Sequence, residues 1–268
     1  MPNTIKTIKL LDGVWLFAEC DATGNDLVDA YLICGNKRAI LIDALCISAG
    51  LYKKVRKITP LPVDVILTHG HEDHAGVSLS EFFGKSGVYI DEKDIFLCET
   101  LCASKDIERL SDGQIFELGG RTLEIISVAG HTPGSVVVLD RANELMFTGD
   151  TIGSGNFWMQ LPESLPLEIF LTNLERLHKT AEPYKNLIIY PGHRRQGSNQ
   201  MTGIYLRDVL AATRRIVDGT LKGRACGMIY KGIEINMKRA GLRTMRGYNF
   251  DPLKISACSS IRRTTPQV

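Results

Sequence analysis

One stretch of the chain is the most informative: Val63-Asp64-Val65-Ile66-Leu67-Thr68-His69-Gly70-His71-Glu72-Asp73-His74-Ala75-Gly76. Its apolar first half predicts a buried strand, and its second half is a turn dense in metal-ligand side chains. Four potential ligands fall within six residues: His69, His71, Asp73 and His74. A His-x-His-x-Asp-His string is far too specific for a polar turn that is histidine-rich by accident. We therefore predict a metal site where this strand ends, with Glu72 pointing away from it to the surface.

Three more segments have the same format, an apolar run followed by a turn with a ligand-type residue. They end at His131 (125–131), Asp150 (145–150) and His193 (187–193). Five of the six histidines thus lie at strand ends, while His178 falls within a predicted helix over 167–180 and is expected to be an ordinary residue. Ligands and metals converge on the loops at strand ends of α/β sheets, so these segments are expected to meet.

The order of predicted elements indicates an α/β fold with mixed sheets covered by helices. β-rich runs at 5–11, 14–18, 27–34 and 39–43 come first, followed by a helix at 51–58, a strand at 63–68, a helix at 75–83, a strand at 88–90 and a helix at 92–101. Strands at 114–118, 121–128, 135–139 and 144–148, the helix at 167–180, a strand at 186–190 and a helix at 201–217 complete the pattern. We expect one domain over 1–217 and a glycine-containing C-terminal extension over 218–268 packed on it.

Composition narrows the function classes. The chain has 268 residues and 44% hydrophobic content, and no apolar run approaches the roughly 20 residues of a membrane span. The first residues lack the features of a secretory signal, and the seven cysteines form no C-x-x-C pair, so we expect a cytoplasmic protein with reduced thiols. Residues 1–193 hold 17 Lys and Arg against 26 Asp and Glu, a net charge of −9, whereas residues 194–268 hold 15 against 4, a net charge of +11. The basic tail fits an anionic substrate, a nucleic acid or the acidic body of the chain itself, within one chain or across a homodimer.

The residue types favour zinc, with iron or manganese as alternatives, because neutral imidazoles and carboxylates suit these ions. Five histidines and two aspartates are too many for one tetrahedral ion that keeps an open position, so two ions are the natural number. Two ions about 3.5 to 4 Å apart can share a hydroxide that attacks a carbonyl or phosphoryl centre. No protein nucleophile is needed, and the chain has no G-x-S-x-G elbow and no complete P-loop.

These motifs resemble those of the metallo-β-lactamase superfamily, and within it the dinuclear glyoxalase II-like hydrolases. The resemblance spans about residues 13 to 217 and rests on Thr68 to His74, Gly130 to Ser135, Thr148 to Asp150 and Pro191 to His193 in the family's order, with Asp43 after an early strand. It implies an αββα sandwich of two mixed sheets. It also implies that His69, His71 and His131 hold a first metal, that Asp73, His74 and His193 hold a second, that Asp150 bridges both, and that Asp43 supports the ligand loop.

The expected function is hydrolysis of a thioester, lactone or other ester, in which Asp73 also orients the attacking hydroxide or passes a proton to the leaving group. Alternatives on the same scaffold are a phosphodiesterase, a mononuclear iron persulfide dioxygenase and a regulator that only binds a partner. His71 disfavours the flavodiiron oxidoreductases, which have a glutamate at this position. A small, anionic substrate is expected, with nucleic acid and membrane disfavoured as partners. Candidate substrate contacts are the aromatic and methionine side chains after Asp150 and two arginines after His193: Phe157, Trp158, Met159, Arg194 and Arg195.

Overall fold

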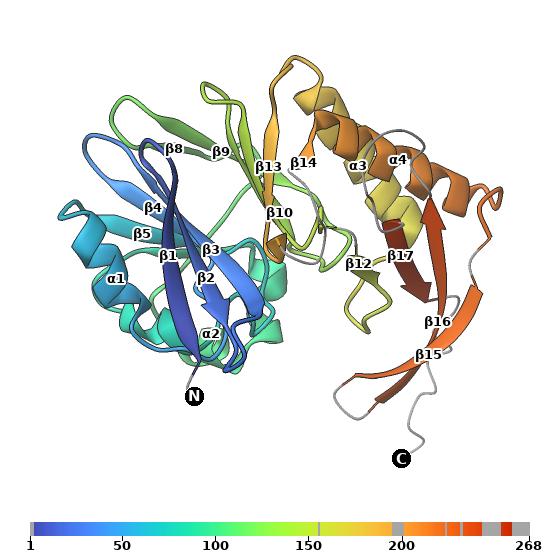
Figure 1. The fold of residues 1–268 in the computed structure, drawn as a ribbon, viewed down its shortest axis with the longest axis horizontal. Helices are drawn as coiled ribbons and strands as arrows, with labels where there is room; N and C mark the ends of the chain where they lie inside the picture. The colour runs from blue at the N-terminus through green and yellow to red at the C-terminus, as the bar shows by residue number, and fades with distance from the viewer. Residues whose placement is uncertain are drawn as a thin grey trace.

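The computed structural model describes residues 3–154, 156–194, 201–222, 224–230, 233–242 and 253–258. Two β-sheets lie back to back, with helices on their outer sides, so the predicted αββα sandwich is confirmed (Figure 1). Arg195, one of the candidate substrate contacts, lies outside the described residues.

The first sheet contains seven strands in the order β1-β2-β3-β4-β5-β6-β7. The first four strands form an antiparallel meander, and β5, β6 and β7 then join in parallel. Their bounds are β1 Thr4–Leu11, β2 Val14–Cys20, β3 Asp26–Cys34, β4 Ala39–Ile42, β5 Val63–Ile66, β6 Val88–Ile90 and β7 Ile107–Arg109.

The second sheet contains six strands in the order β14-β13-β11-β10-β9-β8. All of its pairings are antiparallel except that of β11 with β13, which is parallel. The bounds are β8 Ile115–Glu117, β9 Thr122–Ser127, β10 Val136–Asp140, β11 Leu145–Gly149, β13 Ile188–Pro191 and β14 Met201–Thr202.

Alternation of apolar side chains explains how the central strands are buried on both faces. On β10, Val136 and Val138 point to the core between the two sheets, whereas Val137 and Leu139 point to the core under the outer helices. This period of two places every second side chain on the same face of a strand. Because both faces are covered, these strands read as continuous apolar runs rather than as alternating ones.

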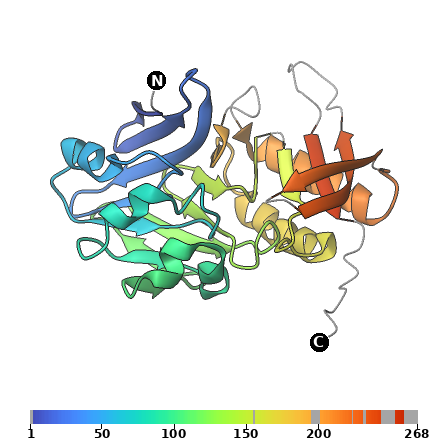
Figure 2. The same ribbon diagram turned by 90° about the horizontal axis from the view of Figure 1, so that it is seen from below.

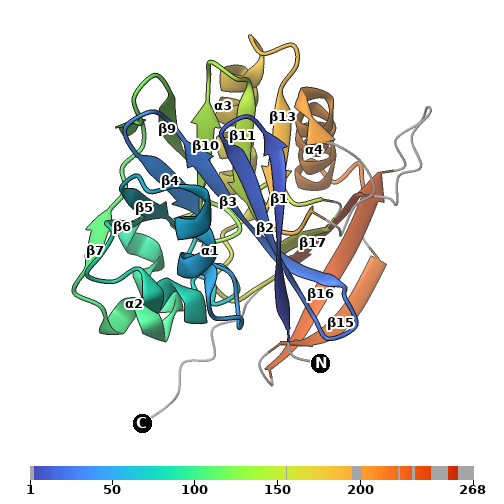
Figure 3. The ribbon, with the colours of Figure 1, turned by 60° about the vertical axis from the view of Figure 1, so that its left-hand side comes forward.

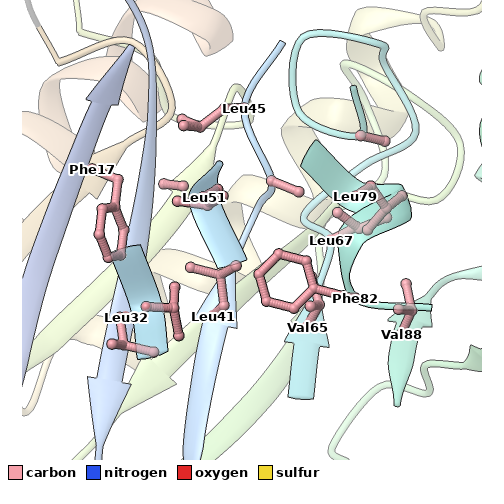
Figure 4. Close-up of a cluster of buried hydrophobic side chains, with 14 of the residues drawn as sticks. Phe17, Leu32, Leu41, Leu45, Leu51, Val65, Leu67, Leu79, Phe82 and Val88 are labelled. Carbon is pink, nitrogen blue, oxygen red and sulfur yellow. The ribbon is translucent and has the colours of Figure 1, made fainter. Parts of the chain in front are cut away.

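Helices cover the outer faces of both sheets (Figure 3). Helix α1 (Leu51–Ile58) and the 3₁₀ helix η1 (Val77–Glu81) pack on the first sheet, where Phe17, Leu41 and Phe82 belong to one buried cluster (Figure 4). Helices α3 (Leu167–Ala181) and α4 (Gly203–Val217) pack on the second sheet through residues such as Phe170 and Leu206. The buried apolar side chains of the described residues therefore form three cores, one between the sheets and one under each helical layer.

The structure differs from the sequence expectation in two helical segments. Only η1 forms where a helix over 75–83 was expected, because Gly76 is extended (ψ −152°) and Gly84 has a φ of +69° that ends the turn. The expected helix over 92–101 is instead a 3₁₀ helix, η2 (Glu92–Leu97), followed by the short α2 (Glu99–Ala103). Cys98 separates the two because its backbone is extended, with φ −134° and ψ 125°.

The described part of the C-terminal extension forms strands that the sequence reading missed. They are β15 (Arg224–Tyr230), β16 (Ile233–Leu242) and β17 (Leu253–Cys258), and with β12 (Asn156–Met159) they make a four-stranded sheet in the order β12-β17-β16-β15. Figure 2 shows this sheet at the α3 and α4 end of the molecule. β17 pairs in parallel with β12, so the extension is hydrogen-bonded to a strand of the preceding domain.

Among the described helices, none has both the length and the apolar character needed to cross a bilayer.

Candidate metal centre

The seven predicted metal ligands and the supporting residue Asp43 follow the ends of five strands. Asp43 comes after β4, the string from His69 to His74 after β5, His131 after β9, Asp150 after β11 and His193 after β13. The sandwich brings these loops together, and the seven predicted metal ligands fall into two adjacent groups of potential metal-ligand atoms. The two sheets therefore bring side chains up to 124 positions apart in the sequence to one site, as we expected from the ligand residues at strand ends.

The first group consists of His69, His71 and His131. Nδ1 of His71 lies 3.1 Å from Nε2 of His69 and 3.0 Å from Nε2 of His131. His69 and His131 are almost completely buried, and the His71 side chain is 11% exposed. Three ring nitrogens thus meet at about hydrogen-bonding distance inside the protein.

Hydrogen bonds on the far sides of these rings fix which nitrogen carries the proton. His131 Nδ1 donates to the carbonyl oxygen of Trp158 (2.7 Å), and His71 Nε2 donates to the Glu163 carboxylate (2.5 Å). His69 Nδ1 lies 3.1 Å from Thr68 Oγ1, whose own proton goes to Asp43, so the threonine oxygen accepts. Each imidazole therefore presents an unprotonated nitrogen to the centre of the group.

The second group consists of Asp73, His74, Asp150 and His193. His193 Nε2 lies 3.2 Å from Asp73 Oδ2 and 3.4 Å from Asp150 Oδ2, while His74 Nε2 lies 3.4 Å from Asp150 Oδ1. The far nitrogens are again fixed, because His74 Nδ1 donates to Asp43 (2.8 Å) and His193 Nδ1 donates to the carbonyl oxygen of Leu27 (2.5 Å). The Asp73 side chain is 38% exposed and is the most accessible member.

Asp150 lies between the two groups. Besides its contacts with His74 and His193, its Oδ2 is 3.8 Å from Nε2 of His131 in the first group. Its side chain is only 14% exposed. The carboxylate is therefore placed where it can reach an ion in either group.

The two groups have opposite electrostatic character. Burial lowers the pKa of His69 well below its ordinary value and that of His131 to about 4, so both rings stay neutral. Burial also opposes charge on His74 and His193, but neighbouring carboxylates outweigh it. Asp43, Asp73 and Asp150 raise the pKa of His74 to about 10, and Asp150 and Asp73 raise that of His193 well above its ordinary value. The second group is thus a place where positive charge is strongly favoured.

These side chains fit bound cations. Three unprotonated imidazole nitrogens that converge in the first group would repel one another, and a shared cation turns that repulsion into ligation. In the second group, His74 Nε2 and Asp150 Oδ1 are buried and make no ordinary hydrogen bond within the described structure. Buried polar atoms are normally satisfied, so two such atoms facing the same point indicate a missing ligand.

Asp43, the residue that the resemblance implied would support the ligand loop, makes three hydrogen bonds to that loop. Its carboxylate accepts from the backbone N–H of Thr68 (2.8 Å), from Thr68 Oγ1 (2.9 Å) and from His74 Nδ1. The residue has a φ of +62°, a conformation that an aspartate tolerates only at some cost. Asp43 thereby orients one histidine of each group, His74 directly and His69 through Thr68.

Asp94, a residue the sequence reading missed, ties two ligand loops together. This buried carboxylate accepts from the backbone N–H groups of Gly70 (3.1 Å) and Gly134 (2.6 Å) and from Thr132 Oγ1 (2.5 Å). Burial raises its pKa even against these three hydrogen bonds. It joins the loop of His69 and His71 to the loop of His131, and no local motif announces it because it sits in an ordinary 3₁₀ helix.

The structure separates the candidate substrate residues. Phe157 and Met159 are 1% and 4% exposed and fill the core with α3 and α4, while Trp158, on the opposite face of β12, stays partly exposed. Arg194 makes ion pairs with Asp26 (3.4 Å) and Asp29 (3.8 Å), so two carboxylates already counter its charge. Trp158 contacts the first group through its backbone, since its carbonyl oxygen accepts from His131 Nδ1.

The two remaining polar residues that the sequence reading set aside do lie away from the groups. Glu72 is exposed although it stands inside the ligand string. His178 lies on α3, where its Nδ1 is 3.5 Å from the Glu182 carboxylate.

Comparison with known proteins gives a family and a set of relatives. Residues 23–193 match the family model described as the metallo-beta-lactamase superfamily. The chain is 29% identical over 136 residues to hydroxyacylglutathione hydrolase GloC of Haemophilus influenzae, a match covering 44% of this chain and 63% of that protein. It is 23% identical over 215 residues to the acyl-coenzyme A thioesterase MBLAC2 of Gallus gallus, covering 67% of this chain and 76% of that protein. Among solved structures, a metallo-beta-lactamase from Pontibacter korlensis superposes with a TM-score of 0.65 at 19% identity, covering 79% of this chain and 99% of that one, which supports the fold.

Proposed function

This chain belongs to the metallo-β-lactamase superfamily, and from that premise we propose that it is a hydrolase of thioesters that uses two metal ions. The observation that carries the proposal is the position of Asp150 between two complete donor groups. Each group offers three side-chain donors besides Asp150, and Asp150 Oδ2 lies 3.8 Å from one group and 3.4 Å from the other. A single ion would fill only one group. It would leave either the converging nitrogens of the first group or the buried, unpaired atoms of the second group without a partner.

The donor set favours zinc. It offers imidazole nitrogens and carboxylate oxygens and, among the described residues, no thiolate within either group. His69, His71 and His131 would hold one ion and Asp73, His74 and His193 the other, with Asp150 shared. Bound there, the ions would supply Lewis acidity toward a carbonyl oxygen and would lower the pKa of water to near 7.

The protein side chains have separate tasks in this reaction. Those around the groups keep the five imidazole rings in fixed orientations through acceptors on their far nitrogens, so the rings need not reorganise during turnover. Asp73 is the ligand carboxylate most open to solvent, and it lies 3.2 Å from His193 Nε2. It is therefore the group placed to orient water or to pass a proton to the leaving thiolate.

Thioesters are favoured over other esters by the relatives rather than by the geometry. MBLAC2 is named as an acyl-coenzyme A thioesterase and GloC as a hydroxyacylglutathione hydrolase. A thiolate is also a good leaving group that needs little protonation, so the reaction requires no strong general acid at the site.

The test measures metal content and turnover together. Protein purified without added metal is analysed for metal by elemental analysis and assayed on an acyl-coenzyme A, a lactone and a phosphodiester. The variants are Asp150→Ala and, as the matched control, His178→Ala, which removes the one histidine outside the site.

We expect the wild type to contain near two equivalents of zinc per chain and to hydrolyse the thioester. Thioester turnover should fall more than about 100-fold in Asp150→Ala and stay unchanged in His178→Ala. One equivalent of iron with oxygen consumption on a persulfide would overturn the hydrolase and support the dioxygenase reading. Two metals with hydrolysis of the phosphodiester alone would overturn the substrate class.

A further inference from the structure

The segment between β12 and α3 packs directly on the first histidine group. The backbone N–H of Leu165 donates to the carbonyl oxygen of Gly130 (2.8 Å), and Ser164 Oγ donates to the carbonyl oxygen of His131 (2.9 Å). Both contacts fix the segment to the loop that carries His131. The residue before them, Glu163, is thereby held in place beside His71.

Glu163 makes one close contact in this position. Its Oε1 lies 2.5 Å from Nε2 of His71, and the two side chains are 13% and 11% exposed. Because a carboxylate accepts, the proton is on Nε2, and the other ring nitrogen, Nδ1, faces His69 and His131 as a lone pair. The histidine is thus clamped with its donor atom directed into the group.

The five histidines of the two groups differ in the acceptor that contacts the ring nitrogen on the side away from the group. His69 is held by a hydroxyl, and His131 and His193 by backbone carbonyls, all of them neutral groups. Only two rings have a carboxylate behind them: His74, with Asp43, and His71, with Glu163. Each group therefore contains one histidine backed by a negative charge, and in the all-histidine group that charge comes from Glu163.

We propose that Glu163 is a positioning residue for the metal of the first group: it holds Nδ1 of His71 toward the ion and makes this imidazole a stronger donor. The inference rests on the metal site of the proposed function but not on its substrate. A carboxylate that accepts the far N–H of a ligand histidine fixes the ring and raises its basicity, and loss of such a partner costs about 10- to 100-fold in metal affinity. Glu163 acts through His71 and is not itself a ligand.

The test compares Glu163→Gln, Glu163→Ala and Glu182→Gln in the full chain. Glutamine keeps the size and an acceptor oxygen but removes the charge, whereas alanine removes both. Glu182→Gln is the matched control, because Glu182 is also paired with a histidine, His178, which belongs to neither group. Zinc affinity is measured by competition with a chelating dye, and the exchangeable ring N–H signals of the cobalt-substituted protein are followed by proton NMR.

We expect zinc affinity for one of the two equivalents to fall about 10- to 100-fold in Glu163→Ala and less in Glu163→Gln, with Glu182→Gln unchanged. One hyperfine-shifted N–H signal, that of His71 Nε2, is expected to exchange faster with solvent in Glu163→Ala, which a merely structural role would not produce. If the alanine variant fails to fold, judged by circular dichroism, the isosteric glutamine variant decides.

Affinities within twofold of wild type in the glutamate-163 variants, with unchanged N–H exchange, would overturn the inference even if the protein hydrolyses thioesters. A wild-type chain that binds zinc with the expected dependence on Glu163 but hydrolyses no thioester would instead overturn the proposed substrate and leave this inference standing.

Discussion

Gly192 offers a test of the metal centre that removes no donor atom. It precedes His193, and a Cβ placed on it would lie 2.3 Å from Cε1 of His74 and 2.9 Å from Oδ1 of Asp150. Ordinary van der Waals contact begins at 3.4 Å, so the new methyl group overlaps the His74 ring by about 1 Å. We therefore predict that Gly192→Ala damages the second donor group by displacing His74 and Asp150.

The surroundings leave the backbone little room to yield. The N–H of Gly192 donates to the carbonyl oxygen of Gly149 (2.8 Å), and its carbonyl oxygen accepts from the N–H of Asp29 (2.7 Å). Moving Gly192 away from His74 would break these hydrogen bonds, and moving His74 would break its contact with Asp43. Overpacking of this kind costs about 1 to 3 kcal/mol of folding free energy, and a ligand displaced by about 1 Å costs about 100-fold in turnover.

The assay measures zinc content by elemental analysis, thioester turnover, and the free energy of unfolding in urea with a chelator present. The chelator matters because bound metal itself stabilises the folded chain. Gly203→Ala is the matched control: Gly203 is the first residue of α4, its added Cβ would meet no atom within 4 Å beyond its own chain neighbours and helix backbone, and no stability should be lost. We expect Gly192→Ala to keep close to one zinc equivalent where the wild type keeps two. Full zinc content and wild-type turnover in Gly192→Ala would refute the placement of His74 and Asp150 at the metal centre.

Three further predictions concern single side chains. Asp43→Ala leaves three buried donors without an acceptor, and urea denaturation of the metal-free chain should show a loss of about 3 kcal/mol or more; a loss under about 1 kcal/mol would contradict the bonding described. Burial raises the pKa of Asp29 to about 6, so its proton stabilises the folded chain below pH 4 and this contribution, about 3 kcal/mol, is lost as pH rises through 6. The unfolding free energy of wild type minus that of Asp29→Asn should therefore fall by about 3 kcal/mol between pH 4 and 7, and parallel curves would contradict this. Phe170→Ala should cost about 3 to 5 kcal/mol by leaving a cavity in the α3 core, whereas Phe96→Ala, at a side chain 64% exposed, should stay within about 0.5 kcal/mol in the same urea assay.

The candidate metal-ligand residues could be predicted from the sequence because each stands in a recognisable local motif. Four of them stand in one turn after β5, and the others follow an apolar run that ends in a glycine and a ligand. The order of most strands and helices could also be predicted from the sequence, because an apolar strand that ends in a polar turn gives a recognisable local pattern. The family's fold then follows from the same motifs, and the strands of both sheets match it.

Prediction from hydrophobic periodicity failed in two segments whose backbone is not a regular α-helix. The segments over 75–83 and 92–101 have apolar spacing close to that of a helix, yet η1 and η2 are 3₁₀ helices. Gly76 lies so close to the carbonyl oxygen of Cys46 that its added Cβ would be 1.9 Å away, and this contact shapes the start of η1. Such a constraint comes from a neighbouring loop, so no window of local sequence contains it.

The sequence by itself determined which residues are candidate metal ligands and which strands carry them, because both signals lie within a few residues of chain. Only the tertiary structure decided which acceptor contacts the far nitrogen of each histidine, and which of the candidate substrate residues are buried or already paired. Glu163 reaches His71 from 92 positions away, and Arg194 is paired with Asp26, 168 positions away. β12 turns Phe157 into the core and leaves Trp158 beside His131. Contacts of this kind depend on how the sheets stack and on strand register, and a long-range pair of polar side chains has no periodic pattern to reveal it.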